Sequence, residues 1–152
     1  MNARRVVIAS DHAGFELKQT LVAELQALGC DAVDLGPADT ASVDYPDFAD
    51  RLAEAIAQDA ADTGVLVCGT GIGISIAANR HRHIRAGLAH DVTSARLMRE
   101  HNDANVLVLG GRLIGPETAR DCLKVFLQTS FEGGRHQRRV DKLSPPSGPR
   151  PA

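Results

Sequence analysis

Residues 65–73 read VLVCGTGIG, and this stretch indicates the fold of the whole chain. The run 65–68 is apolar at every position, which is typical of a strand buried on both faces of a sheet. Three glycines at alternate positions follow it and lead into a short segment through Ile76 and Ala77 that we expect to be helical. A buried strand that turns directly into a helix is the repeating unit of a parallel α/β sheet.

The same alternation continues on both sides of this stretch. We expect four more strands, at residues 6–9, 32–35, 84–89 and 106–109, with a helix after every strand. The first helix is predicted by the apolar stripe Leu17, Leu21, Leu25 and Leu28. The sequence therefore predicts an α/β fold: a single doubly wound, Rossmann-like domain with a five-stranded parallel sheet and helices on both faces.

We expect one domain over residues 1–143, followed by a tail. The domain includes a basic C-terminal segment, residues 132–142, which contains the run RHQRR at 135–139. Residues 144–152 hold four prolines and no hydrophobic periodicity, which indicates a flexible Pro-rich tail.

The composition excludes several classes of protein. The chain has 152 residues and a net charge of −2, so no overall field favours nucleic acid or an anionic membrane. No apolar run approaches the length of about 18 residues that a membrane-spanning helix requires. Aromatic residues make up 3% of the chain, which argues against a ligand held by aromatic stacking. The three cysteines are far apart and form no C-x-x-C pair, which favours a reducing cytoplasm.

Candidate ligand-binding residues cluster at the predicted carboxyl ends of the strands, where open parallel sheets bind ligands. Asp11 and His12 follow the first strand, and Cys68 ends the third. The alternate glycines of the loop 69–73 allow backbone amides to form a nest for an anion, although a plain strand-to-helix turn would have the same pattern. The loop matches neither a dinucleotide fingerprint nor a P-loop.

Each of these residues also has a purely structural interpretation. A buried cysteine is often a small hydrophobe, whereas Cys68 beside a helix start could be a reactive thiolate. Asp11 could cap the next helix. Arg135 and Arg139 are four residues apart, so in a helix they share one face and could hold a phosphate. The alternative is that they form an ordinary solvated helix face. We expect no metal and no cofactor, because neither H-x-x-x-H nor E-x-x-H occurs.

Five motifs closely resemble the ribose 5-phosphate isomerase B family, which includes galactose 6-phosphate and allose 6-phosphate isomerases. They are SDHAG at 10–14, DYP at 44–46, CGTGIGISIAAN at 68–79, EHNDANV at 100–106 and EGGRHQRRV at 132–140. The resemblance implies metal-free aldose–ketose isomerisation through a cis-enediolate. It also implies a homodimer, or a tetramer of such dimers, whose active sites lie between subunits.

The resemblance further implies a role for individual residues. Cys68 corresponds to the base that moves the proton between C1 and C2, and Ile74 stands where other members use a glutamate, so the chain resembles the cysteine type. Asp11 corresponds to the proton shuttle between the substrate oxygens and His101 to the acid that opens the sugar ring, and Thr70 completes the catalytic set. The implied substrate contacts are Asp11, His12, Tyr45, Gly69, Thr70, Gly71, Ile72, Gly73, Asn102, Arg112, Arg135, His136 and Arg139.

Among these contacts, the amides of residues 69–73 would stabilise the enediolate, and His12, Arg112, Arg135 and Arg139 would bind the phosphate. We therefore expect a ribose 5-phosphate isomerase. Two alternatives remain open at this point. One is an isomerase of another sugar phosphate, such as allose 6-phosphate, galactose 6-phosphate or a tetrose phosphate. The other is a non-catalytic module that binds phosphosugars, against which the retained Cys68, Asp11 and His101 argue.

Overall fold

A computed structural model describes residues 2–143 and contains one five-stranded sheet. All pairings are parallel and the strand order is β2-β1-β3-β5-β4, which confirms the predicted doubly wound fold. The edge strand β4 is shorter than the predicted 84–89, because its pairing with β5 covers only three residues. The strands are β1 (Arg5–Ser10), β2 (Asp31–Asp34), β3 (Thr63–Cys68), β4 (Ala86–Leu88) and β5 (Val106–Gly110).

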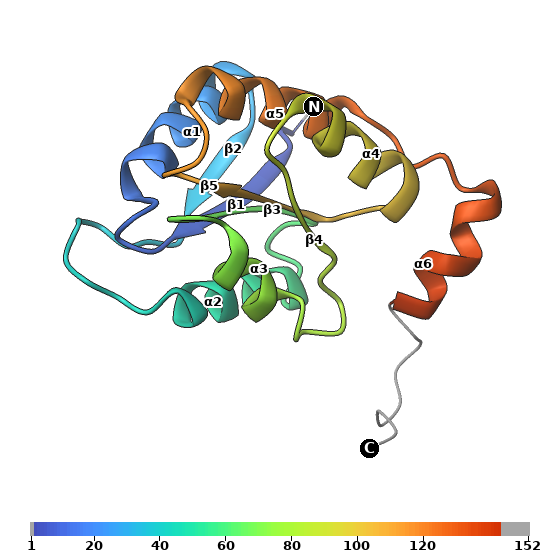
Figure 1. Cartoon of the computed structure of the whole chain (residues 1–152), viewed down its shortest axis with the longest axis horizontal. Coiled ribbons are helices and arrows are strands. Elements are labelled where there is room, and N and C mark those ends of the chain that lie inside the picture. Colours follow the sequence, from blue (N-terminus) through green and yellow to red (C-terminus); the bar gives the residue numbers. More distant parts are fainter. Residues whose placement is uncertain (1, 144–152) are drawn as a thin grey trace.

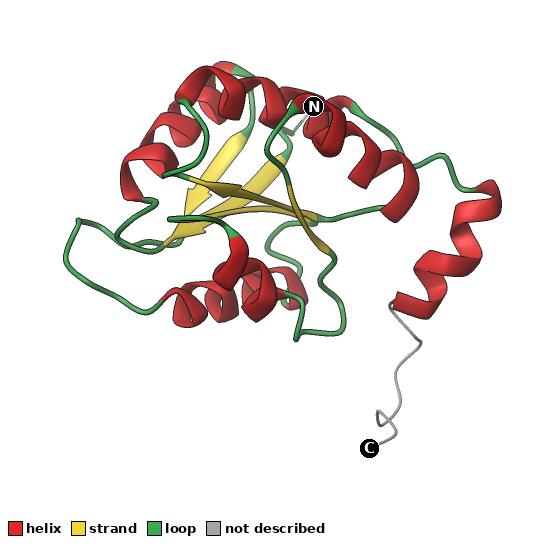
Figure 2. Cartoon of the chain, in the orientation of Figure 1, coloured by secondary structure: helices red, strands yellow, loops and turns green. Residues whose placement is uncertain are grey.

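Helices cover both faces of the sheet, as Figures 1 and 2 show. One face packs against α1 (Phe15–Ala27), α4 (Val92–Asn102) and α5 (Pro116–Gln128), and the other against α2 (Tyr45–Ala57) and α3 (Ile72–Ala78). Two apolar clusters result, one on each side of the sheet. The central strands β3 and β5 are buried at every position because they contribute side chains to both clusters.

Local sequence explains where several helices begin. The Asp91 carboxylate accepts a hydrogen bond from the backbone N–H of Ser94 over 2.7 Å, so Asp91 caps α4. This bond is also the main cause that lowers the pKa of Asp91. Pro46 and Pro116 lie in the first turns of α2 and α5, where the missing N–H costs nothing.

One charged side chain of α1 is completely buried. The ammonium of Lys18 donates to the two carboxylate oxygens of Asp34 over 2.7 and 2.8 Å, and to the carbonyl of Pro37 over 2.8 Å. Its three donors are therefore all paired, which offsets the cost of burying the charge. These bonds from Lys18 hold the end of β2 and the segment that follows it against α1.

The basic segment is helical but in two pieces. A 3₁₀ turn, η1 (Gly134–His136), leads into α6 (Gln137–Leu143), which stands apart from the sheet on the β4 side (Figure 1). The predicted tail, residues 144–152, lies outside the described residues. Across residues 2–143, no helix is both long and apolar enough to cross a membrane.

Candidate active site

Three loops meet at the carboxyl edge of the sheet, because β1, β3 and β5 are neighbours. The N–H of Asp11, after β1, donates to the carbonyl of Val67 over 3.2 Å. On the other side, the N–H of Gly111 donates to the carbonyl of Cys68, and the N–H of Arg112 to that of Gly69, both over 2.8 Å. Backbone bonds therefore fix the positions of these loops relative to one another.

Cys68 lies at the centre of this group, as the last residue of β3. Its side chain is 4% exposed, and the backbone N–H of Gly71 donates to its sulfur over 3.2 Å. The N–H of Ile72 donates to the hydroxyl of Thr70 over 3.2 Å. The sequence predicts that the amides of Gly71 and Ile72 contact the ligand. In the structure both stabilise the turn by internal hydrogen bonds, and the Gly71 amide is directed at the Cys68 sulfur.

The other two cysteines have different surroundings. Cys122 is fully buried on the inner face of α5, and burial, with a smaller effect from the charges of Asp91 and Asp121, raises its pKa to about 11. Cys30 is half-buried beside the α1 cluster. Of the three thiols, Cys68 is therefore the one that adjoins the carboxyl-edge loops.

Glycines make the tight packing of these loops feasible. Gly71 has φ +78°, a conformation that side chains disfavour, and a Cβ there would overlap the Leu88 side chain and lie 3.1 Å from the carbonyl carbon of Leu109. A Cβ at Gly110 would lie 2.5 Å from the Thr70 carbonyl oxygen. The backbone of the turn after Cys68 therefore packs directly against the backbone at the end of β5, with no room for side chains at Gly71 and Gly110.

We expect Gly71→Ala to lower the free energy of unfolding by about 2–4 kcal/mol, because it combines a strained φ with overpacking. It should also reduce turnover, since the amide directed at Cys68 must move. Gly29→Ala is the matched control: Gly29 has φ +79° but nothing within 4 Å of a Cβ, so we expect a loss of about 1–2 kcal/mol and unchanged turnover. Chemical denaturation and initial rates test both; equal losses of stability would contradict the packing argument.

Asp11 and His12 occupy the loop after β1. Asp11 is 7% exposed and its carboxylate accepts the N–H of Gly14 over 2.9 Å, so it closes a turn before α1 and is not the residue that caps the helix. His12 accepts the N–H of Val43 at Nδ1 over 3.2 Å. In a neutral His12 ring the proton therefore resides on Nε2, which can donate to an anion.

Arg112 and Tyr45 border the same loops. The Arg112 side chain runs across Gly69, where a Cβ would come within 3.3 Å of its Cδ. The Tyr45 ring lies over Gly73, where a Cβ would lie 2.6 Å from Cζ. Tyr45 and Gly73 also line a cavity of about 550 Å³ between α2 and α3. Both side chains are at least partly exposed and thus accessible to a ligand.

The remaining predicted residues lie elsewhere. His101 and Asn102 are the last residues of α4, which runs back to the amino edge of the sheet before β5 begins. The imidazole rings of His101 and His136 stack with centroids 4.3 Å apart. Arg135 and Arg139 are exposed in η1 and α6. The length of β5, about 15 Å, separates this group from Cys68.

The structure therefore assembles two half-sites in one chain and does not bring them together. The carboxyl-edge half-site contains Asp11, His12, Tyr45, Cys68, residues 69–73 and Arg112. The amino-edge half-site contains His101, Asn102, Arg135, His136 and Arg139. Glu132 belongs to the second group as well, since its carboxylate lies 3.5 Å from Nε2 of His136, and the sequence had assigned it no role.

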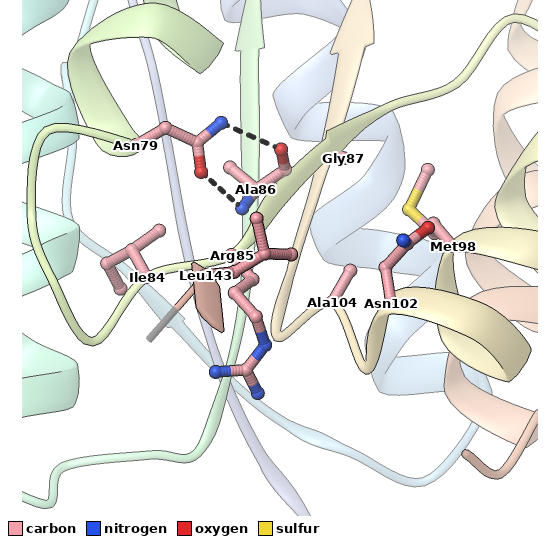
Figure 3. Close-up of a pocket in the computed structure, with 9 residues that line it drawn as sticks. All are labelled: Asn79, Ile84, Arg85, Ala86, Gly87, Met98, Asn102, Ala104 and Leu143. Carbon is pink, nitrogen blue, oxygen red and sulfur yellow. Dashed lines mark hydrogen bonds between the residues drawn. The ribbon is translucent and has the colours of Figure 1, made fainter. Parts of the chain in front are cut away.

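A second cavity, of about 380 Å³, lies between the edge strand β4 and Leu143 of α6 (Figure 3). Asn102 and Met98 of α4 form one wall. On the opposite wall, the Asn79 side chain donates to the carbonyl of Ala86 over 2.9 Å and accepts its N–H over 2.8 Å. Asn102 is the only predicted site residue among the lining side chains, so this cavity is not the space around Cys68.

A doubly wound sheet with a cysteine, a carboxylate and a glycine-rich turn at its carboxyl edge is the arrangement typical of an α/β enzyme. The model of the family described as Ribose/Galactose Isomerase matches residues 6–143. The chain belongs to that family and is an isomerase.

Individual relatives agree along nearly the whole chain. Ribose-5-phosphate isomerase B of Escherichia coli K12 is 43% identical over 141 residues, which cover 93% of this chain and 95% of the relative. The crystal structure of a ribose 5-phosphate isomerase from Thermotoga maritima matches with a TM-score of 0.91 at 50% identity, covering 94% of this chain and 99% of the other. Ribose-5-phosphate isomerase B of Mycoplasma genitalium, whose structure contains bound ribulose 5-phosphate, matches with a TM-score of 0.89 at 40% identity, covering 94% and 95%.

Proposed function

We propose that the chain interconverts ribose 5-phosphate and ribulose 5-phosphate without a metal, and that Cys68 is the base. The observation that carries the proposal is the position of Cys68: its sulfur ends a buried strand, next to the Asp11 loop, and accepts the N–H of Gly71. The family and the names of the relatives support the choice of reaction and substrate.

In the proposed reaction, the Cys68 thiolate removes the proton from C2 of the open-chain aldose. The C2–H electron pair forms the C1=C2 double bond and the carbonyl π pair moves onto O1, which gives a cis-enediolate. Asp11 transfers a proton from O2 to O1, and the Cys68 thiol returns its proton to C1, which yields the ketose. A base alone is insufficient for so weak a carbon acid, so backbone amides of the turn 69–73 stabilise the charge on the substrate oxygens.

We propose that the phosphate binds between the hydrogen-bond donor of His12 and the positive charge of Arg112. His12 offers its Nε2–H, because Nδ1 is occupied by the Val43 amide. Arg112 adds a guanidinium from the loop after β5. Arg135 and Arg139 supply two more guanidiniums, which are exposed and lie far from the Cys68 of their own chain.

We further propose that a second copy of the chain completes each site. The division of the residues into two half-sites supports this, since a chain acting alone would leave the ring-opening acid His101 about 15 Å from the base. In a two-fold symmetric dimer, the amino-edge half-site of one copy meets the carboxyl-edge half-site of the other. The symmetry repeats this contact, so the dimer has two complete sites. Exposed apolar side chains on α3, Ile72 and Ile76, are available for such a contact.

A substrate panel tests the proposed function. We expect ribose 5-phosphate to have the highest kcat/KM among ribose 5-phosphate, allose 6-phosphate, galactose 6-phosphate and a tetrose phosphate, and we expect EDTA to leave its turnover unchanged. The initial rate of ketose formation is the measurement. A higher kcat/KM for one of the other sugars would reassign the substrate, and loss of turnover in EDTA would overturn the metal-free mechanism.

A further inference from the structure

Two histidines and a glutamate gather at the end of α4. Their ligand atoms, one each from His101, Glu132 and His136, all lie within 4.8 Å of one another. The two imidazole planes are 16° apart, and the Glu132 carboxylate lies 3.5 Å from Nε2 of His136. Within residues 2–143, this is the one group of three such side chains that could hold a metal ion.

The backbone holds these three residues in place. The N–H of Glu132 donates to the carbonyl of Glu100 over 3.1 Å, which fastens the C-terminal segment beside His101. Gly133 and Gly134 both have positive φ, +65° and +55°, and turn the chain so that His136 comes back over the end of α4. His136 is 7% exposed, so its ring has little freedom to swing away.

The donor set suits one class of cation. Two imidazole nitrogens and one carboxylate oxygen are ligands that Zn²⁺ and similar transition-metal ions prefer, with a fourth position left for water, whereas Mg²⁺ and Ca²⁺ prefer oxygen. Tetrahedral Zn²⁺ places neighbouring ligand atoms about 3.3–3.5 Å apart. The His136–Glu132 pair already has that separation. An imidazole binds a metal in the plane of its ring, so the half-buried His101 ring has to rotate out of its stack on His136 and approach by up to about 1.5 Å.

We propose that His101, Glu132 and His136 bind one Zn²⁺-class ion, and that the bound ion reversibly inhibits the isomerase. The inhibition rests on the proposed function, in which His101 opens the sugar ring. An imidazole nitrogen whose lone pair is donated to a metal can neither accept nor deliver a proton. Metal binding therefore removes the ring-opening acid while Cys68 stays intact.

Calorimetric titration tests the site independently of turnover. The full chain carrying Cys68→Ala is used, so that the thiolate cannot bind the metal. We expect one Zn²⁺ per chain and no binding of Mg²⁺. Glu132→Gln in the same background should weaken Zn²⁺ binding at least about 10-fold, because it removes an anionic ligand. His90→Asn, which removes an exposed histidine elsewhere, should leave it unchanged. Absence of Zn²⁺ binding, or equal affinity in these two variants, would overturn the site.

Initial rates on ribose 5-phosphate test the inhibition. With the wild-type Cys68, Zn²⁺ should abolish turnover and EDTA should restore it. Glu132→Gln should need at least about 10-fold more Zn²⁺ for half-inhibition, with each rate taken relative to the same variant's own rate in EDTA. Zn²⁺ that binds without slowing turnover, or equal inhibition of wild type and Glu132→Gln, would overturn the inhibitory role. If the chain has no turnover in EDTA, the proposed function and the inhibition fail together, whereas the calorimetric result still decides the metal site.

Discussion

Replacing Cys68 by alanine lowers the turnover of ribose 5-phosphate by roughly 10²–10⁴-fold, the usual contribution of a positioned base, and leaves binding of the phosphosugar nearly unchanged. The loss is expected in kcat, because the sulfur acts on a proton that moves only in the chemical step. Binding persists because the groups proposed to hold the phosphate, among them His12 and Arg112, belong to other loops. Initial rates and calorimetry on the same preparations measure the two quantities.

The alanine variant keeps the fold, since alanine fits a buried strand end and removes only one atom beyond Cβ. Cys30→Ala is the matched control: it also removes a thiol, but from a half-buried position beside α1, and we expect wild-type turnover. Turnover in Cys68→Ala equal to that of the control would show that another group is the base.

Mixing two inactive variants restores activity if sites are shared between copies. Cys68→Ala and His101→Asn each inactivate both sites of a homodimer. In a dimer that contains one chain of each kind, one site holds both substitutions and the other holds none. Random exchange of equal amounts makes half of the dimers mixed, so about a quarter of all sites return to wild type. Initial rates before and after exchange, at a fixed total concentration of chains, give the measurement.

The matched control uses two substitutions in the same half-site. Cys68→Ala mixed with Asp11→Asn places one substitution in each of the two sites, so we expect no recovery. Recovery in this pair as well, or none in the first pair, would contradict a site built from the carboxyl edge of one copy and the amino edge of another.

The fold could be predicted because its signals are local. Three strands are apolar throughout, and Asp91 and Pro116 mark helix starts without reference to the rest of the chain. Lys18 was not predicted: in the sequence it is one polar position in an amphipathic helix, and its burial depends on Asp34 and on a carbonyl 19 residues away. Burial that depends on such a distant partner leaves no periodic signal.

The carboxyl-edge half-site could also be predicted, because its residues directly follow strands that are neighbours in a parallel sheet. The cluster at the end of α4 could not. The absence of H-x-x-x-H is the reason that the sequence predicts no metal site, and that prediction is still to be tested. His101 and His136 are far apart in sequence and meet where the C-terminal segment is bonded to Glu100. Spacing rules detect ligands on one element, whereas the proposed ligands come from two.

The side chain of Asn79 has a consequence for assembly. By occupying both the N–H and the C=O of Ala86, it caps the exposed margin of a strand that is only three residues long. A strand of a neighbouring chain therefore cannot form a continuous row of backbone hydrogen bonds with β4, which blocks one route to aggregation by edge-strand pairing. Association by strand addition is therefore disfavoured at the β4 edge, and we expect Asn79→Ala to increase aggregation on heating, measured by light scattering, before it affects the chemistry at Cys68.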